Sequence, residues 1–130
     1  MSLETAMRSI LFCLILLWSA SAFAATATFK CTFSTFSDRK AVGQKAEDGL
    51  PMTFLVDSKA GKAYVIGNNG SNEVVLVQNQ DGFTLVEITG TGNVMVTAIT
   101  FGGQAVHSRH SMVSKSEIIP SQYYGRCTTQ

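Results

Sequence analysis

The sequence predicts an all-β fold, an antiparallel meander of about eight strands that is barrel-like and closed by one disulfide bond. Apolar and polar residues alternate with a period of two in successive segments about ten residues apart. The gaps between these segments contain Asn-Gly, Asp-Gly and Gly-Gly pairs, which are typical of tight hairpins because these residues tolerate positive φ. No amphipathic helical pattern is present beyond the N-terminal apolar run.

Residues 1–24 have the three parts of a secretory signal peptide. A short polar stretch ends at Arg8, an apolar run follows, and Ala22-Phe23-Ala24 is an A-x-A cleavage pattern. The apolar run of roughly ten residues is short for a bilayer span, which needs about 20. The alternative is an uncleaved anchor. We therefore expect an exported protein, periplasmic or extracellular, with no membrane attachment after cleavage and a single domain over residues 25–130.

The composition excludes several classes of protein. The chain has 130 residues, of which 45% are hydrophobic and 15% charged, so it is too short for two ordinary domains and too apolar for a disordered chain. The formal net charge is +1, which provides no electrostatic footprint for nucleic acid. We therefore expect no nucleic-acid partner.

The expected strands follow one another along residues 25–130. In the first of them Phe29, Cys31 and Phe33 share one face, and later segments carry alternating Met, Phe and Val or short runs of β-branched residues. The predicted strands are residues 28–33, 51–57, 62–67, 72–78, 83–88, 94–101, 104–110 and 122–127. Residues 37–50 are predicted to be an exposed, charged loop with at most one helical turn, and residues 114–121, which include Pro120, to be irregular.

Two cysteines lie near the two ends of the predicted domain. Cys31 and Cys127 are 96 positions apart, and export would permit them to form a disulfide bond. Closing a loop of that length contributes about 4–5 kcal/mol in the chain-entropy model. The alternative is a pair of free, buried thiols. Because the first and last strands carry these cysteines, a bond between them favours a closed barrel over an open sandwich.

The stretch 105–111 concentrates the polar groups that suit a binding site. It contains both histidines of the chain, His107 and His110, together with Arg109. On a strand, His107 and Arg109 share one face and His110 lies on the other. Arg109, His107 and nearby hydroxyls suit a small anionic ligand. The alternatives are a solvated strand end where Arg109 pairs with an acidic residue such as Glu87, and a metal or hydrolytic site at His107 and His110, which requires the strand to bend.

The last predicted strand carries a pair of adjacent tyrosines. Tyr123 and Tyr124 point to opposite faces of a strand, so one belongs to the core and the other is exposed. An exposed tyrosine near Arg126 suits stacking on a ligand or a partner, and we assign Tyr124 to the ligand-binding set with His107, Arg109 and His110. The alternative is a tyrosine whose hydroxyl closes the end of the barrel.

The sequence contains no recognisable catalytic framework. A G-x-S-x-G elbow, a phosphate-binding loop and a dinucleotide fingerprint are all absent, and its glycines lie at the hairpins instead. We therefore expect a protein that is not an enzyme, with no catalytic residues, no metal and no cofactor.

One hairpin carries a short motif that resembles a known family. The residues SKAGKAY at positions 58–64 have the S-x-x-G-x-x-Y spacing of the bacterial C-type lysozyme inhibitors, which are small periplasmic β-barrels. Cysteines near both ends of the domain are also similar. The resemblance implies that Ser58, Lys59 and Tyr64 enter the lysozyme cleft, where positive and hydroxylic groups suit catalytic carboxylates. The tail from His107 to Cys127 also looks like that of uncharacterised small exported bacterial proteins, a similarity that implies no activity.

Together these patterns predict an exported, non-enzymatic β-barrel that binds an unknown protein or a small anionic ligand. A protein inhibitor acting through Ser58, Lys59 and Tyr64 is the first alternative. A metal-binding or hydrolytic site at His107 and His110 is the second.

Overall fold

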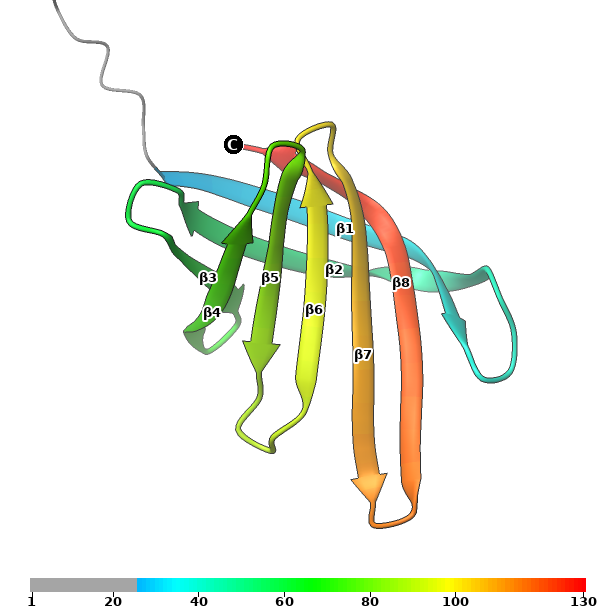
Figure 1. Cartoon of the computed structure of the whole chain (residues 1–130). Coiled ribbons are helices and arrows are strands. Elements are labelled where there is room, and N and C mark those ends of the chain that lie inside the picture. Colours follow the sequence, from blue (N-terminus) through cyan, green and yellow to red (C-terminus); the bar gives the residue numbers. More distant parts are fainter. Residues whose placement is uncertain (1–25) are drawn as a thin grey trace, which may run out of the picture.

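The computed structural model describes residues 26–130, which form eight antiparallel strands in a closed barrel (Figure 1). The expected signal peptide lies outside the described residues. The strands are β1 (Thr26–Asp38), β2 (Gln44–Asp57), β3 (Lys62–Gly67), β4 (Gly70–Gln78), β5 (Gly82–Ile88), β6 (Val94–Thr100), β7 (Gln104–Ser114) and β8 (Glu117–Thr129). Each strand pairs with its neighbours in the sequence, and β8 pairs with β1, so the predicted all-β barrel is confirmed. Residues 26–130 include no helix that is long and apolar enough to span a membrane.

The alternation in the sequence places one face of each strand in the core. In β1, Cys31 and Phe33 are buried. Lys30, which precedes Cys31, and Thr32, which lies between the two, are exposed. The core consists of Cys31, Phe33, Phe54, Val56, Ala63, Val74, Phe83, Leu85, Ile99, Ala105 and Cys127. Because these side chains come from all eight strands, the core fills the barrel interior.

The predicted disulfide bond joins the first and last strands. Cys31 and Cys127 lie directly opposite each other in the β1–β8 register and are bonded to each other. The two ends of the described chain also lie side by side, because the Gln130 N–H donates a hydrogen bond of 2.9 Å to the Thr28 carbonyl. The terminal strands are therefore fastened to each other both by the sheet and by a covalent bond.

The two ends of the barrel differ in how they are filled. We call the end with the turns β1–β2, β3–β4, β5–β6 and β7–β8 the hairpin end, and the opposite end, where both ends of the described chain lie, the terminal end (Figure 1). Aromatic rings pack toward the terminal end, where the ring centroids of Phe29 and Phe83 are 4.8 Å apart and those of Phe83 and Phe101 are 6.4 Å apart. Toward the hairpin end the rings of Phe36 and Tyr123 stack with their centroids 5.6 Å apart, and the guanidinium of Arg109 lies over the Tyr123 ring.

Two segments expected to be irregular are strand hairpins instead, so those predictions were wrong. Residues 37–50 complete β1 and begin β2, and the Asp38 carboxylate closes the turn by accepting the N–H groups of Lys40 and Ala41 at 2.8 and 3.1 Å. Residues 114–121 are mostly in β8, which begins at Glu117. Pro120 is tolerated there because β8 pairs only with β7 at this level, since the β1–β8 pairing stops at Ser121. Figure 1 shows both long hairpins extending beyond the barrel wall.

Two strand glycines are required by close packing of neighbouring strands. A Cβ on Gly125 would overlap the Thr32 carbonyl and lie 2.6 Å from the Phe33 Cα atom. A Cβ on Gly82 would overlap the Ile99 carbonyl. Gly82 has no positive φ, so the turn chemistry expected of the Asp81-Gly82 pair is not the reason for this glycine. The glycine instead allows β5 and β6 to approach closely.

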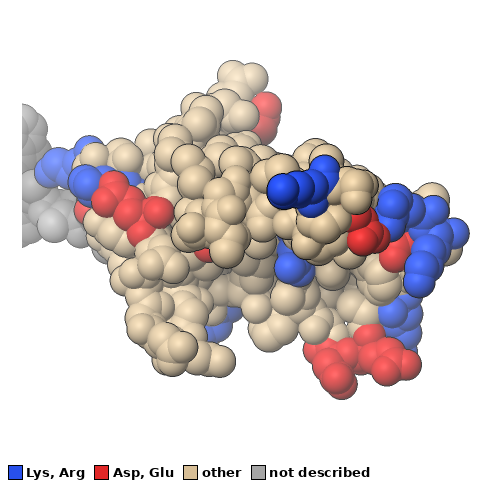
Figure 2. Space-filling model, turned by 90° about the horizontal axis from the view of Figure 1, so that it is seen from below, with Lys and Arg blue, Asp and Glu red and all other residues tan. Residues whose placement is uncertain are grey.

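Charged side chains are dispersed over the face seen from below in Figure 2, which looks onto the hairpin end. Lys and Arg residues lie in small groups among Asp and Glu residues, and most of this face carries no charge. Two exposed ion pairs are present among the described residues, Arg39–Glu117 at 3.3 Å and Lys62–Glu73 at 2.7 Å. Exposed pairs of this kind contribute little to stability.

Candidate ligand site

The barrel interior contains a buried polar pair. His107 on β7 is 2% exposed and Thr97 on β6 is 3% exposed, and the two residues lie directly opposite each other in the sheet. The His107 Nδ1 atom and the Thr97 hydroxyl share a hydrogen bond of 2.8 Å. This bond uses one ring nitrogen, and the ring makes no other hydrogen bond with the described residues. The second ring nitrogen therefore remains available for another group.

The environment of His107 keeps its ring neutral. Burial lowers the pKa of His107, and the positive charge of Arg109 lowers it further, to about 4. The ring packs against aromatic neighbours, with its centroid 5.8 Å from that of Phe33 and 6.1 Å from that of Tyr123. At neutral pH this histidine acts as a hydrogen-bonding group and carries no charge.

Arg109 lies on the same inner face of β7, two residues after His107 and nearer the hairpin end. Its guanidinium carbon is 5.7 Å from the centre of the Tyr123 ring, and Tyr123 in turn stacks on Phe36 at 5.6 Å between ring centroids. The Arg109 Nε atom is buried and has no hydrogen-bond partner in the described chain. A buried, unpaired guanidinium nitrogen is costly, and such groups normally have a partner.

Arg109 and Glu87 do not form the ion pair that was one of the alternatives suggested by the sequence. Glu87 is opposite Met95 and Met95 is opposite Arg109, so the acidic side chain is on the same inner face two strands away. The ion pairs of the described residues do not include Arg109. The positive charge of this side chain is therefore left without a direct counter-charge.

Arg109 and His107 line a cavity that is open to solvent at the hairpin end of the barrel. Its volume is about 240 Å³. The remaining wall is formed by the apolar residues Leu50, Pro51, Met52, Val65, Ile66 and Met95. We call this space the inner cavity. It combines an apolar wall with one cation and one neutral imidazole, which is the usual composition of a small-molecule site.

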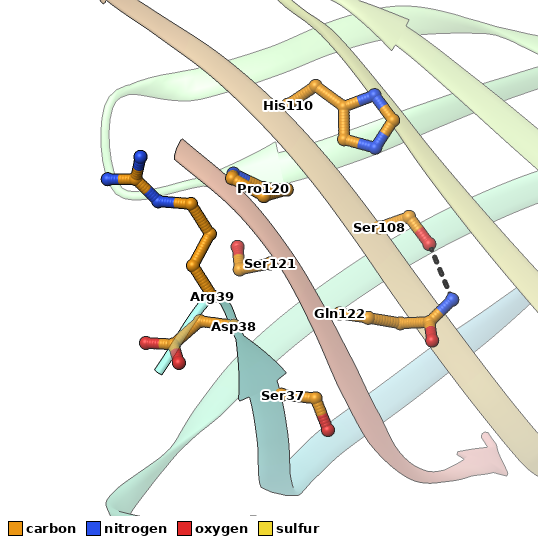
Figure 3. A pocket seen from close by; sticks show the side chains of 8 residues that line it. All are labelled: Ser37, Asp38, Arg39, Ser108, His110, Pro120, Ser121 and Gln122. Carbon is orange, nitrogen blue, oxygen red and sulfur yellow. Dashed lines mark hydrogen bonds between the residues drawn. The ribbon is translucent and has the colours of Figure 1, made fainter. Parts of the chain in front are cut away.

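A second hollow lies outside the barrel, and His110 lines it. This outer groove of about 300 Å³ is lined by Ser37, Asp38, Arg39, Ser108, His110, Pro120, Ser121 and Gln122 (Figure 3). Its main polar groups already have partners. Asp38 closes the β1–β2 turn, Arg39 is paired with Glu117, and the Gln122 amide donates to the Ser108 hydroxyl at 3.1 Å. None of the residues that line the outer groove has a buried side-chain polar atom without a hydrogen-bond partner, whereas Arg109 in the inner cavity has one.

The four residues assigned to the ligand site from the sequence are divided between these two faces. His107 and Arg109 lie together in the inner cavity. His110 is exposed on the outer face, opposite Val94 and Pro120. Tyr124 is also on the outer face, where its hydroxyl donates to the Gln122 side chain at 2.7 Å. The structure does not bring the two histidines to a common point, as the alternation along β7 predicts.

Metal-binding side chains are not clustered in the described chain. No group of three or more His, Cys, Asp or Glu residues has metal-binding geometry within residues 26–130. Cys31 and Cys127 are joined to each other.

The residues that resemble the lysozyme-inhibitor motif lie on the β2–β3 hairpin. Ser58 and Lys59 are exposed in the turn, which belongs to the terminal end, and Tyr64 is half-buried on the outer wall of β3. The Asp57 carboxylate accepts the Ala60 N–H at 2.8 Å and orders the turn. This hairpin and the inner cavity belong to opposite ends of the barrel.

Three residues of the inner cavity region were missing from the sequence-based set, namely Tyr123, Met52 and Met95. Tyr123 could have been found from the disulfide bond. Because Cys127 points inward, every second residue before it in β8 does so too, which selects Tyr123 over Tyr124. The two methionines show only the ordinary alternation of a core strand, so the sequence contains no signal that places them near Arg109.

The fold and the inner cavity together define a small closed β-barrel with Arg109 as the cationic residue that lines the inner cavity at its hairpin end. Comparison with models of known families, with curated proteins and with solved structures found no match to this chain. The chemistry of the inner cavity is therefore the main guide to what the protein does.

Proposed function

We propose that this protein is an exported, non-enzymatic binding module that holds a small anionic ligand at Arg109 in the inner cavity. One observation carries the proposal. Arg109 lines a cavity large enough for a small molecule, and its positive charge takes part in no ion pair among the described residues. An anion bound against the guanidinium would supply the missing counter-charge.

Neighbouring residues support the same ligand chemistry. The Tyr123 ring, 5.7 Å from the guanidinium carbon, restricts the orientation of Arg109. His107 is neutral, so its second nitrogen contributes a hydrogen bond without adding charge. The site therefore recognises an anion through one fixed cation and one neutral ring. None of these three side chains is an activated nucleophile.

The test is a binding measurement with a panel of small anions, namely acetate, phosphate, sulfate and phenylacetate. We expect at least one of them to bind the wild-type protein and to bind Arg109→Gln roughly tenfold to a hundredfold more weakly, because a charged hydrogen bond is lost. Arg39→Gln is the matched control, since Arg39 is paired with Glu117 on the outer surface. The proposal is wrong if no anion of the panel binds, or if both variants bind as the wild type does.

Export is part of the proposal and has its own support. The N-terminal pattern of residues 1–24 is typical of a signal peptide, and the Cys31–Cys127 disulfide is compatible with an oxidising compartment. Cell fractionation followed by mass measurement of the purified protein tests it. We expect to find the protein outside the cytoplasm, with the mass of a chain that begins at Ala25.

A second candidate is a protein inhibitor that acts through the β2–β3 hairpin. The observation in its favour is that Ser58 and Lys59 are exposed in a turn that Asp57 orders, as an inserted loop requires. A lysozyme activity assay tests this candidate. Inhibition that is lost in Lys59→Glu but kept in Lys115→Glu, at the far end of the barrel, would support it, and absence of inhibition by the wild type would remove it.

A further inference from the structure

The inner cavity has a second property, the apolar character of most of its wall. Six of its eight lining residues are apolar, and only His107 and Arg109 can make polar side-chain contacts. A small hydrated anion would leave these apolar groups in contact with water. Burial of an apolar group against them is favourable by about 25 cal/mol per Å² of apolar surface removed from water.

The size of the inner cavity limits the apolar part of the ligand. A dry cavity of roughly 150 Å³ holds a benzene molecule. The inner cavity, at about 240 Å³, has room for a ring of that size and one attached polar group. Met52 and Met95 both line it, and a thioether packs favourably against an aromatic ring and adapts to its shape.

The charges around the inner cavity limit the polar part of the ligand. Arg109 is its one cationic lining residue, and His107 is neutral because its pKa is about 4. Glu87 lies on the same inner face two strands away and would repel a second negative charge. A single negative charge therefore matches the site better than a doubly charged phosphate monoester does.

We infer that the ligand is a small monocarboxylate with an apolar, ring-sized body, whose carboxylate lies against Arg109 and whose body packs between Met52 and Met95. This inference rests on the proposed function, because it names the class of anion that Arg109 holds. The planar fork of the guanidinium suits a planar carboxylate, and the second nitrogen of His107 is the next donor or acceptor in reach.

The experiment is an NMR titration of protein labelled at the methionine methyl groups with phenylacetate, acetate and benzyl alcohol. We expect phenylacetate to bind at least about tenfold more tightly than either other probe, because only phenylacetate satisfies both the cation and the apolar wall. The Met52 and Met95 methyl signals should shift. The Met112 methyl, which is on the exposed β7–β8 hairpin, should not shift and is an internal control.

Variants separate the two parts of the ligand. Arg109→Gln should weaken phenylacetate binding roughly tenfold or more, while Arg39→Gln should leave it unchanged. Should Arg109→Gln fail to fold, Arg109→Lys keeps the charge without the fork and is expected to give an intermediate affinity. Glu87→Gln should tighten binding, because it removes the nearby negative charge.

Each outcome decides between the inference and the proposed function. If acetate binds as tightly as phenylacetate, and binding of both depends on Arg109, the proposed anion site is supported. The inference that the ligand has an apolar body is then wrong. If benzyl alcohol binds as tightly as phenylacetate and Arg109→Gln has no effect, the inner cavity is an apolar pocket and both proposals fail. The inference fails if none of the three probes binds, and the proposed function fails with it if phosphate and sulfate do not bind either.

Discussion

His107 is a polar residue in an otherwise apolar interior, and its position has a cost that depends on pH. Within the described chain its ring hydrogen-bonds only to the Thr97 hydroxyl, and Arg109 lies beside it with a fixed positive charge. Protonation of His107 would place a second positive charge in this region. The folded state therefore resists protonation of His107, and the pKa of this residue falls from 6.5 to about 4.

This shift predicts a loss of stability in acid. Between pH 6.5 and about 4 the unfolded chain binds a proton at His107 that the folded protein does not bind, so the free energy of unfolding falls as the pH is lowered. We expect this contribution to be on the order of 2 kcal/mol and to change no further below about pH 4. Urea unfolding measured at several pH values checks it.

Two histidine variants isolate this effect from the titration of carboxylates. In His107→Gln the extra loss between pH 6.5 and 4 should disappear, whatever the change in absolute stability. In His110→Gln, which alters an exposed ring on the outer face, the pH dependence should match that of the wild type. An unchanged pH profile in His107→Gln would show that the buried ring is not the responsible group.

The candidate site was only partly predictable at the residue scale. Strand alternation correctly places His107 and Arg109 on one face and His110 on the other, because this needs only a period of two. It cannot show that Arg109 lacks a partner, since that depends on which strands meet across the barrel. Tyr124 was assigned to the ligand set, but Tyr123 is the tyrosine beside Arg109.

At the scale of the secondary-structure elements, β8 lies very close to β1 around Gly125. Gly125 lies against the Thr32 carbonyl and the Phe33 Cα atom of β1, so the backbones are closer there than a side chain would allow. This contact is next to the Cys31–Cys127 pair. The fit between β1 and β8 therefore depends on a residue without a Cβ.

We predict that Gly125→Ala lowers the free energy of unfolding by about 2–3 kcal/mol, because the added methyl group must displace the β1 backbone. Gly90→Ala is the matched control, since nothing lies within 4 Å of a Cβ at that position and its φ is not positive. Chemical denaturation of both variants checks the prediction. Equal stability of the two would contradict the close approach.

Strand identity was predictable from the sequence, whereas strand length was not. All eight strands coincide with segments of alternating or β-branched residues, and this signal comes from burying one face of each strand. The hairpin ends of β1, β2, β7 and β8 extend past the core, so their residues show no such alternation. Val113 and Ile118, for example, are 53% and 54% exposed although each belongs to a strand.

For the whole molecule, closure of the barrel depends on one long-range pairing. Only the β1–β8 contact joins the ends of the meander, and Cys31–Cys127 makes it covalent. We predict that the double variant Cys31→Ala/Cys127→Ala loses about 4 kcal/mol of unfolding free energy, because the unfolded chain is no longer cross-linked over 96 positions. Denaturation of the wild type in a reductant should give the same value, and an unaffected variant would contradict the prediction.

A closed meander with adjacent ends also predicts that the chain can be permuted. The Gln130 N–H bonds to the Thr28 carbonyl, so a flexible linker of about six residues should join Gln130 to Thr26. We expect a permutant opened at the exposed β5–β6 turn, between Gly90 and Thr91, to fold into the same barrel. A permutant opened inside β8 should not fold, and circular dichroism with thermal unfolding distinguishes the two results.

The same pairing imposes an order on biosynthesis. A ribosome makes β1 first and β8 last, so β1 can form its hairpin with β2 early but has no second neighbour until Cys127 has been made. Within residues 26–130 the partner of Cys31 is Cys127, which belongs to the last strand. This disulfide bond can therefore form only after β8 has been made, and its appearance shows that the last strand is present.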